Sequence, residues 1–192
     1  MSTLMLASEI TRRPVVTLGG EIVARVKDVV LDGRAGRISG FTLSGLGLLS
    51  GPLRQALPWE AVTGLGPDAV MIQDETAFQD LDEVAEPKEA AGGDVLGARV
   101  LTDSGTDLGQ VADVVIEVTA SQAVVAGYEI APGEALAGRK RATVFIPLAR
   151  TIAVSGEALV VPAAVADYVT DDLVALHKAI PELRSRMNGK KA

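Results

Sequence analysis

An internal repeat is the feature of this sequence that most constrains its fold. The segment from Pro14 to Asp32 lines up with the segment from Ala98 to Glu117. At an offset of 85 residues, identical residues meet in both copies: Gly20 with Gly105 and Asp28 with Asp113. Further along the chain the offset becomes 87 and then 89, and it grows only at turns, where insertions are tolerated. The sequence therefore predicts two copies of one module.

Each copy has the pattern of short β-strands separated by turns. In the first copy, a Gly19-Gly20 turn separates two runs that are rich in β-branched residues, as in a hairpin. The triplets Val29-Val30-Leu31 and Val114-Val115-Ile116 are apolar throughout, which is typical of strands buried on both faces. Each copy has five or six short strands in about 65 residues, which favours a sheet that closes on itself. Closure pairs the backbone groups that an open sheet would leave exposed at its edges.

Two motifs within the copies resemble the PRC-barrel family. The second copy carries Gly105-Thr-Asp-Leu-Gly-Gln-Val-Ala-Asp-Val114 almost as the family has it, whereas the first copy has Ala24 in place of the usual glycine. Conversely, the first copy keeps Pro58-Trp-Glu-Ala-Val62, which degrades to Pro147-Leu-Ala-Arg-Thr151 in the second. The resemblance covers roughly residues 8–75 and 94–163. It implies a small barrel that docks onto something larger, as in the photosynthetic reaction-centre H subunit and a ribosome maturation factor.

We therefore expect a mainly β protein with two small tandem PRC-barrel-like domains and a C-terminal helix. The expected domains are residues 1–75 and 94–164. Between them, residues 76–93 are predicted to form an acidic linker with a short helix, because Phe78, Leu81 and Val84 recur every three residues.

The remaining segment, 165–192, is predicted to be a helix followed by a basic, mobile tail that includes Arg184 and Arg186. Its apolar residues recur at helical spacing and form one stripe: Val169, Leu173, Leu176, Ile180, Leu183 and Met187. Thr170 is the expected N-cap of a helix over roughly residues 170–180. Pro181 is expected to kink or break this helix, with a short second piece beginning at Pro181. The stripe needs a partner surface, which is either a barrel of the same chain or a second subunit. In the second case Leu173, Leu176 and Ile180 would mediate a homodimer.

Composition argues against catalysis and against metal or cofactor binding. The chain has no cysteine and one histidine, His177, which excludes thiolate sites and His-cluster metal sites. Paired carboxylate chemistry needs a pocket that the sequence does not reveal, so we interpret the repeated acids as turn-forming. These residues are assigned structural roles at turns: Gly20, Asp28, Gly105, Asp113 and Trp59. We expect no enzyme activity and no cofactor.

Two surface segments are candidates for partner binding. The first is a glycine-rich loop whose apolar side chains either cover one end of the barrel or form an exposed patch: Leu46, Leu48, Leu49 and Leu53. The second is a basic cluster that could contact phosphates or an acidic partner: Arg139, Lys140 and Arg141. The net charge of -7 and the pI of 4.8 argue against a surface that coats nucleic acid.

The function that fits these features best is a non-enzymatic scaffold or adaptor that docks onto a protein complex. One alternative is an RNA- or ribosome-associated processing factor, and another is a soluble regulatory subunit recruited to a membrane complex. The N-terminal residues lack a signal-peptide pattern, and the uncharged run from Ile38 to Leu53 is too short and too glycine-rich to span a membrane. We therefore expect a cytoplasmic protein. The sequence does not identify the partner, the pathway, the oligomeric state or a small ligand.

Overall fold

The structure, a computed structural model, divides into two compact units. It describes residues 2–32, 36–47, 50–84, 95–139, 141–148, 153–154 and 157–189. Unit 1 comprises Met1, Ala7–Gly92 and Val118–Val124, and unit 2 comprises Ser2–Leu6, Gly93–Glu117 and Val125–Ala192. The N-terminal residues 2–6, expected in the first domain, thus belong to the unit of the second copy. Conversely, Val118–Val124, expected in the second domain, belong to unit 1, although the strands β10 and β11 that they join lie mainly in unit 2.

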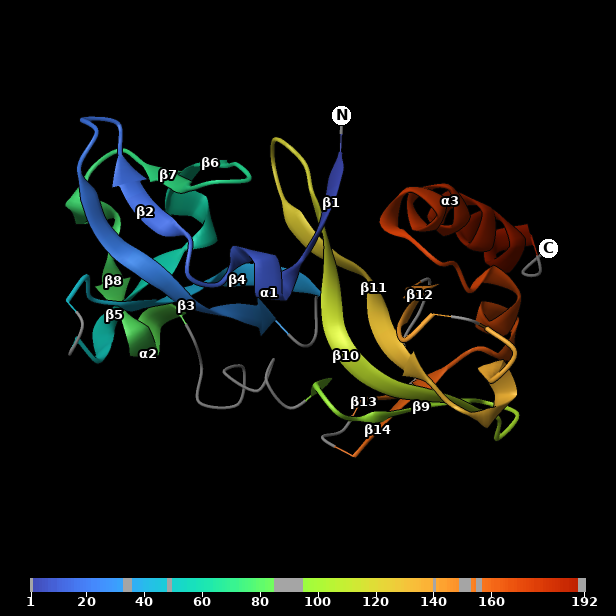
Figure 1. Ribbon diagram of the computed structural model, residues 1–192. Helices are drawn as coiled ribbons and strands as arrows, with labels where there is room; N and C mark the ends of the chain where they lie inside the picture. The colour runs from blue at the N-terminus through green and yellow to red at the C-terminus, as the bar shows by residue number, and fades with distance from the viewer. Residues whose placement is uncertain are drawn as a thin grey trace. The chain divides into compact units, whose positions relative to one another are not determined.

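Unit 1 is a curled sheet with little helix (Figure 1). Its strands are β2 (Pro14–Thr17), β3 (Ile22–Asp32), β4 (Arg37–Ser44), β5 (Pro52–Pro58), β6 (Val62–Leu65), β7 (Val70–Ile72) and β8 (Gln79–Asp80). Strand β3 lies between β2 and β4, β7 pairs in parallel with β2, and β6 pairs with β7. On the other side, β5 pairs with β4, and β8 pairs with β5. Among the described residues of unit 1, the helical elements are α1 (Ala7–Ile10), α2 (Leu81–Val84) and the 3-10 turns Trp59–Ala61 and Glu75–Ala77.

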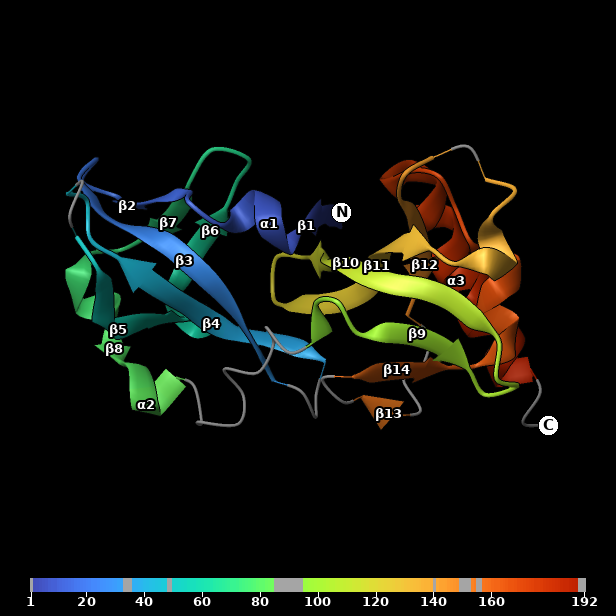
Figure 2. The ribbon, with the colours of Figure 1, turned by 60° about the horizontal axis from the view of Figure 1, so that its bottom comes forward.

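Unit 2 repeats this sheet and adds a long helix (Figure 2). Its strands are β1 (Thr3–Leu6), β9 (Arg99–Thr102), β10 (Asp107–Val118), β11 (Ala123–Pro132), β12 (Val144–Pro147), β13 (Ala153–Val154) and β14 (Ala158–Val161). Strand β10 lies between β9 and β11, β14 pairs in parallel with β9, and β12 pairs with β11. The short strand β13 pairs with β14, and β1 pairs with β10. The helical elements include the 3-10 segments Glu134–Leu136 and Ala163–Tyr168 and the helix α3 (Leu173–Gly189).

The first turn of each copy has the same hydrogen bonds in both units, which confirms the repeat. In unit 1, the backbone N–H of Gly20 donates to the carbonyl of Thr17 at 2.9 Å, and Gly105 donates to Thr102 at 2.9 Å in unit 2. Both glycines have a left-handed conformation, with φ of 88° and 84°. Because side chains disfavour this conformation, glycine is required at both positions. The parallel pairs β2–β7 and β9–β14 follow with equivalent registers.

A second matched glycine pair holds neighbouring strands close together. A Cβ atom at Gly40 would lie 2.3 Å from the carbonyl oxygen of Leu57, and one at Gly127 would lie 2.3 Å from that of Ile146. Each glycine is buried and lets two backbones approach more closely than any side chain allows. The repeat therefore extends to the backbone packing between β4 and β5 and between β11 and β12.

The structure describes the acidic segment after the first copy as far as residue 84. The structure replaces the predicted single helix by a 3-10 turn, the two-residue strand β8 and the one-turn helix α2. Phe78 lies between these elements, so the three-residue apolar spacing does not correspond to one helix. Val84 is buried and would contact a Cβ at Gly40, so these residues pack on unit 1.

The C-terminal helix α3 differs from the prediction at both its start and its centre. It begins at Leu173, and Asp172 is the N-cap, because its carboxylate accepts the backbone N–H of Ala175 at 2.7 Å. Thr170, the expected cap, instead forms a β-bridge with Phe145. Pro181 does not break the helix, which continues to Gly189. Pro181 lies on the exposed face of α3. The opposite face packs on unit 2, and this packing holds the two halves of the helix in line.

The tail predicted to be mobile from Arg184 onward is helical as far as Gly189. Arg186 pairs with Asp167 at 2.8 Å and lies over the ring of Tyr168, and Arg184 Nη2 lies 4.0 Å from Glu117 Oε2. Both arginines are therefore part of α3 and contact unit 2. Lys190 and Lys191 lie outside the described residues.

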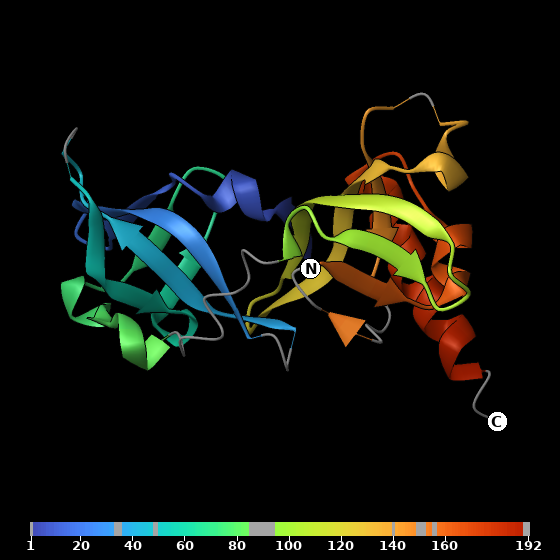
Figure 3. The same ribbon diagram turned by 90° about the horizontal axis from the view of Figure 1, so that it is seen from below.

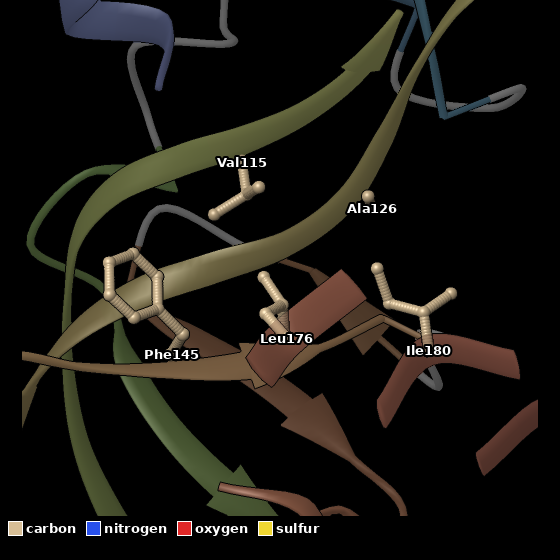
Figure 4. Packing of buried hydrophobic residues seen from close by; sticks show 5 residues of the cluster. All are labelled: Val115, Ala126, Phe145, Leu176 and Ile180. Carbon is tan, nitrogen blue, oxygen red and sulfur yellow. The ribbon is translucent and has the colours of Figure 1, made fainter. Parts of the chain in front are cut away.

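The apolar stripe of α3 packs into the core of its own unit (Figure 4). Leu176 and Ile180 form a buried cluster with one residue from each of three strands: Val115, Ala126 and Phe145. Leu4 and Leu6 of β1 and Leu173 of α3 pack against this cluster. The stripe was predicted to pack either on a barrel of the same chain or on a second subunit. The structure shows it packed on unit 2 of the same chain. The side chains of Leu176 and Ile180 are thereby inaccessible to a second subunit, with exposures of 0% and 4%.

Candidate interaction site

The glycine-rich leucine loop of the first copy presents apolar side chains at one end of unit 1. Leu46 is 50% exposed, and Leu53 is half-buried. Leu48 and Leu49 lie outside the described residues. The loop therefore includes a large side chain that does not cover the sheet.

Two further exposed apolar residues lie in the turn after β2 and at the start of β3. Leu18 is 58% exposed and Ile22 is 50% exposed. Arg25 of β3 pairs with Ser44 of β4, so Ile22 and Leu46, which lie beyond this pair on adjacent segments, occupy the same end of the sheet. Figure 3 shows the strongly curved strands of unit 1, including β3 and β4, from below. We name Leu18, Ile22, Leu46 and Leu53 the hairpin end. The leucine-rich loop in the sequence indicated Leu46 and Leu53 of this surface. Leu18 and Ile22 have the sequence pattern of ordinary strand residues and were not indicated.

The predicted basic cluster is used in part within unit 2. Arg139 donates from Nη1 to Asp171 Oδ1 at 3.0 Å and from Nη2 to the carbonyl of Val169 at 2.9 Å. It therefore fixes the segment that leads into α3. Arg141 is exposed, and Lys140 lies outside the described residues.

The two repeated acids, Asp28 and Asp113, were assigned to turns but lie within the equivalent strands β3 and β10, in different environments. Asp113 is 7% exposed, and its carboxylate accepts the backbone N–H of Val114 at 2.7 Å. The side chain of Asp28 is 64% exposed, and its Oδ2 lies 3.6 Å from Lys27 Nζ. The backbone N–H of Asp28 donates to Thr42 Oγ1. Among the residues that the structure describes, no three His, Asp or Glu side chains are placed to hold a metal ion.

A pocket of about 350 Å³ beside Trp59 is the feature that the sequence did not indicate. It is built within unit 1 from the start of β4, the 3-10 turn after β5, β8 and α2, together with the turn at residues 121–123. Its wall combines one indole with charged and polar side chains: Arg37, Ser39, Trp59, Glu60, Gln79 and Glu83. The sequence assigned Trp59 a role in a turn, which the 3-10 turn Trp59–Ala61 agrees with. The pocket itself depends on strands that are distant in sequence.

Comparison with known proteins agrees with the duplication. The family model of the PRC-barrel domain matches the chain twice, over residues 2–78 and 87–167. No curated protein matches it. PRC-barrel domains are protein-interaction and scaffold modules, and the family is generally non-catalytic. Across the described part of the chain, no helix combines the length and apolar character needed to cross a membrane. With both copies matched, the chain belongs to the PRC-barrel domain family as a tandem of two such domains.

Proposed function

We propose that this protein is a non-enzymatic adaptor that docks onto a protein partner through the hairpin end of unit 1. The observation that carries the proposal is the exposure of Leu18, Ile22 and Leu46, each at least half accessible. They follow β2, begin β3 and follow β4, beyond the end of the β3–β4 ladder at the Arg25–Ser44 pair. Burying such a side chain stabilises a complex by about 1.5–3 kcal/mol when it is covered completely. Grouped apolar residues of this kind mark protein interfaces.

The family supports the proposal, because its members serve as interaction modules. The partner is expected to offer an apolar surface with a polar rim, since the strands around the hairpin end carry exposed Glu21 and Arg25. No specific observation favours the RNA-associated alternative, because Arg139 of the basic cluster is already bound to Asp171.

Affinity capture from native lysate, with and without nuclease, tests this function. The wild-type chain is compared with a Leu18→Ser/Ile22→Thr variant and with Leu96→Ser, a control of similar exposure (51%) in unit 2. We expect a set of nuclease-resistant proteins that the double variant loses and the control retains. Capture that disappears with nuclease, or that the double variant leaves unchanged, contradicts the proposal.

Circular dichroism must show that both variants remain folded. Because all three positions are exposed, each change is expected to alter the free energy of unfolding by no more than about 0.5 kcal/mol.

A further inference from the structure

The pocket beside Trp59 has a composition that fits a specific chemical group. Its volume of about 350 Å³ falls within the range of about 300–1,000 Å³ that is usual for small-ligand pockets. Trp59 is held against Phe41, a fully buried residue, with ring centroids 6.2 Å apart and planes tilted by 59°. The indole is therefore fixed by the core on one side while it lines the pocket with another part of its surface.

The charge around the indole is predominantly negative. Glu60 and Glu83 line the pocket, and Arg37 is the one basic side chain among its described lining residues. Within the described residues, no ion pair joins Glu60, Glu83 or Arg37 to another side chain. The segment from Gln79 to Val84 adds Asp80 and Asp82 and has no basic residue. Acidic walls of this kind concentrate cations near the pocket.

We propose that this pocket receives an arginine side chain of the partner protein. A guanidinium group stacks on aromatic rings, and its several N–H donors can serve two carboxylates at once. It would lie against Trp59 and donate to Glu60 and Glu83. The inference deepens the proposed adaptor function, because it adds a polar, specificity-determining contact to the apolar contact at the hairpin end.

Trp59 provides the readout, because it is the only tryptophan in the chain. The probe is the peptide Ac-Gly-Arg-Gly-NH2, titrated while the emission of Trp59 is recorded, with Ac-Gly-Glu-Gly-NH2 and Ac-Gly-Leu-Gly-NH2 as matched peptides. We expect a saturable change with the arginine peptide alone. Raising the salt concentration should weaken the binding, because the charged groups are exposed.

Three variants test the assigned roles. Glu60→Gln/Glu83→Gln should weaken binding at least about 10-fold, because both charged acceptors are lost. Arg37→Gln should strengthen it by a factor of about 2–5, because a like charge is removed. Glu75→Gln, an exposed residue outside the pocket, should leave it unchanged.

A response that does not saturate, equal binding of the glutamate peptide, or insensitivity to Glu60→Gln/Glu83→Gln overturns the inference. The adaptor function has a separate test in the capture experiment with Leu18→Ser/Ile22→Thr. If that experiment succeeds while the peptide does not bind, the adaptor function stands and the arginine pocket fails.

Discussion

The Leu176→Ala substitution tests whether α3 is part of the core of unit 2. Leu176 is completely buried in the cluster with Val115, Ala126 and Phe145. Removal of three carbon atoms loses about 2.4 kcal/mol of transfer free energy at about 0.8 kcal/mol per methylene. The cavity left between helix and strands adds to this loss, and buried Leu→Ala changes cost about 2–5 kcal/mol in total. We therefore expect the free energy of unfolding of unit 2 to fall by about 3–4 kcal/mol.

Chemical denaturation followed by two probes measures this effect. Far-ultraviolet circular dichroism reports on α3, the longest helix of the described residues, whereas the fluorescence of Trp59 reports on unit 1. The dichroism transition should shift to lower denaturant. Val174→Ala is the matched control, since Val174 lies on the same helix but is 69% exposed. It should change the free energy by about 0.5 kcal/mol or less.

Light scattering distinguishes packing within the chain from pairing between chains. A helix that packs on its own unit predicts that Leu176→Ala lowers stability without changing the molecular mass. If the variant instead halves the mass and leaves the stability of the monomer intact, α3 serves a dimer interface and the intramolecular core is wrong. If neither the denaturation curve nor the mass changes, Leu176 is buried neither in the core of unit 2 nor in an interface between two chains.

Two further predictions concern unit 2. A Cβ at Gly109 would lie 2.0 Å from the carbonyl oxygen of Ala131, and Gly109 has φ of 136°. Gly109→Ala should therefore lower the free energy of unfolding, measured by thermal or chemical denaturation, by at least about 2 kcal/mol. Ala24→Gly, at the equivalent position of the first copy, should lower it by about 0.5–1 kcal/mol. A hydrogen bond from Arg99 lowers the pKa of Asp107. Because the pKa of Asp107 is lower in the folded than in the unfolded chain, its carboxylate stabilises the fold at pH values above the unfolded pKa. This contribution is lost as the pH falls through the folded pKa. Asp107→Asn should therefore lower the free energy of unfolding by less than about 1 kcal/mol at neutral pH and not at all at low pH. Equal effects of the two glycine-site changes, or a pH-independent cost of Asp107→Asn, would contradict these predictions.

The duplication and the turns could be read from the sequence because they depend on local residue types. Gly20 and Gly105 adopt left-handed conformations that glycine alone accepts readily, so their position marks a turn. The apolar triplets at Val29 and Val114 fall within β3 and β10, as their continuous apolar character predicted. Such signals act within a few residues and need no knowledge of the rest of the chain.

The helix at the C-terminus shows where local signals fail. The spacing of Leu176, Ile180 and Leu183 predicted the buried stripe, and all three are buried. Propensity also predicted a kink or break at Pro181 and a short second piece after it, but one helix continues through Pro181 to Gly189. The free energy of packing the stripe onto β10, β11 and β12 opposes the local cost of the proline, and that packing involves residues far away in the sequence.

The candidate site likewise depends on tertiary structure. The leucine loop was visible as a pattern, but its neighbours Leu18 and Ile22 become part of the hairpin end only through the register of β2, β3 and β4. The pocket beside Trp59 joins β4 and α2, whose residues Arg37 and Glu83 are separated by more than 40 positions. The sequence alone thus determined the repeated module and its turns, since these follow from local conformational preferences. Only the tertiary structure decided which strands and helices pack together, because pairing and burial depend on contacts between distant segments.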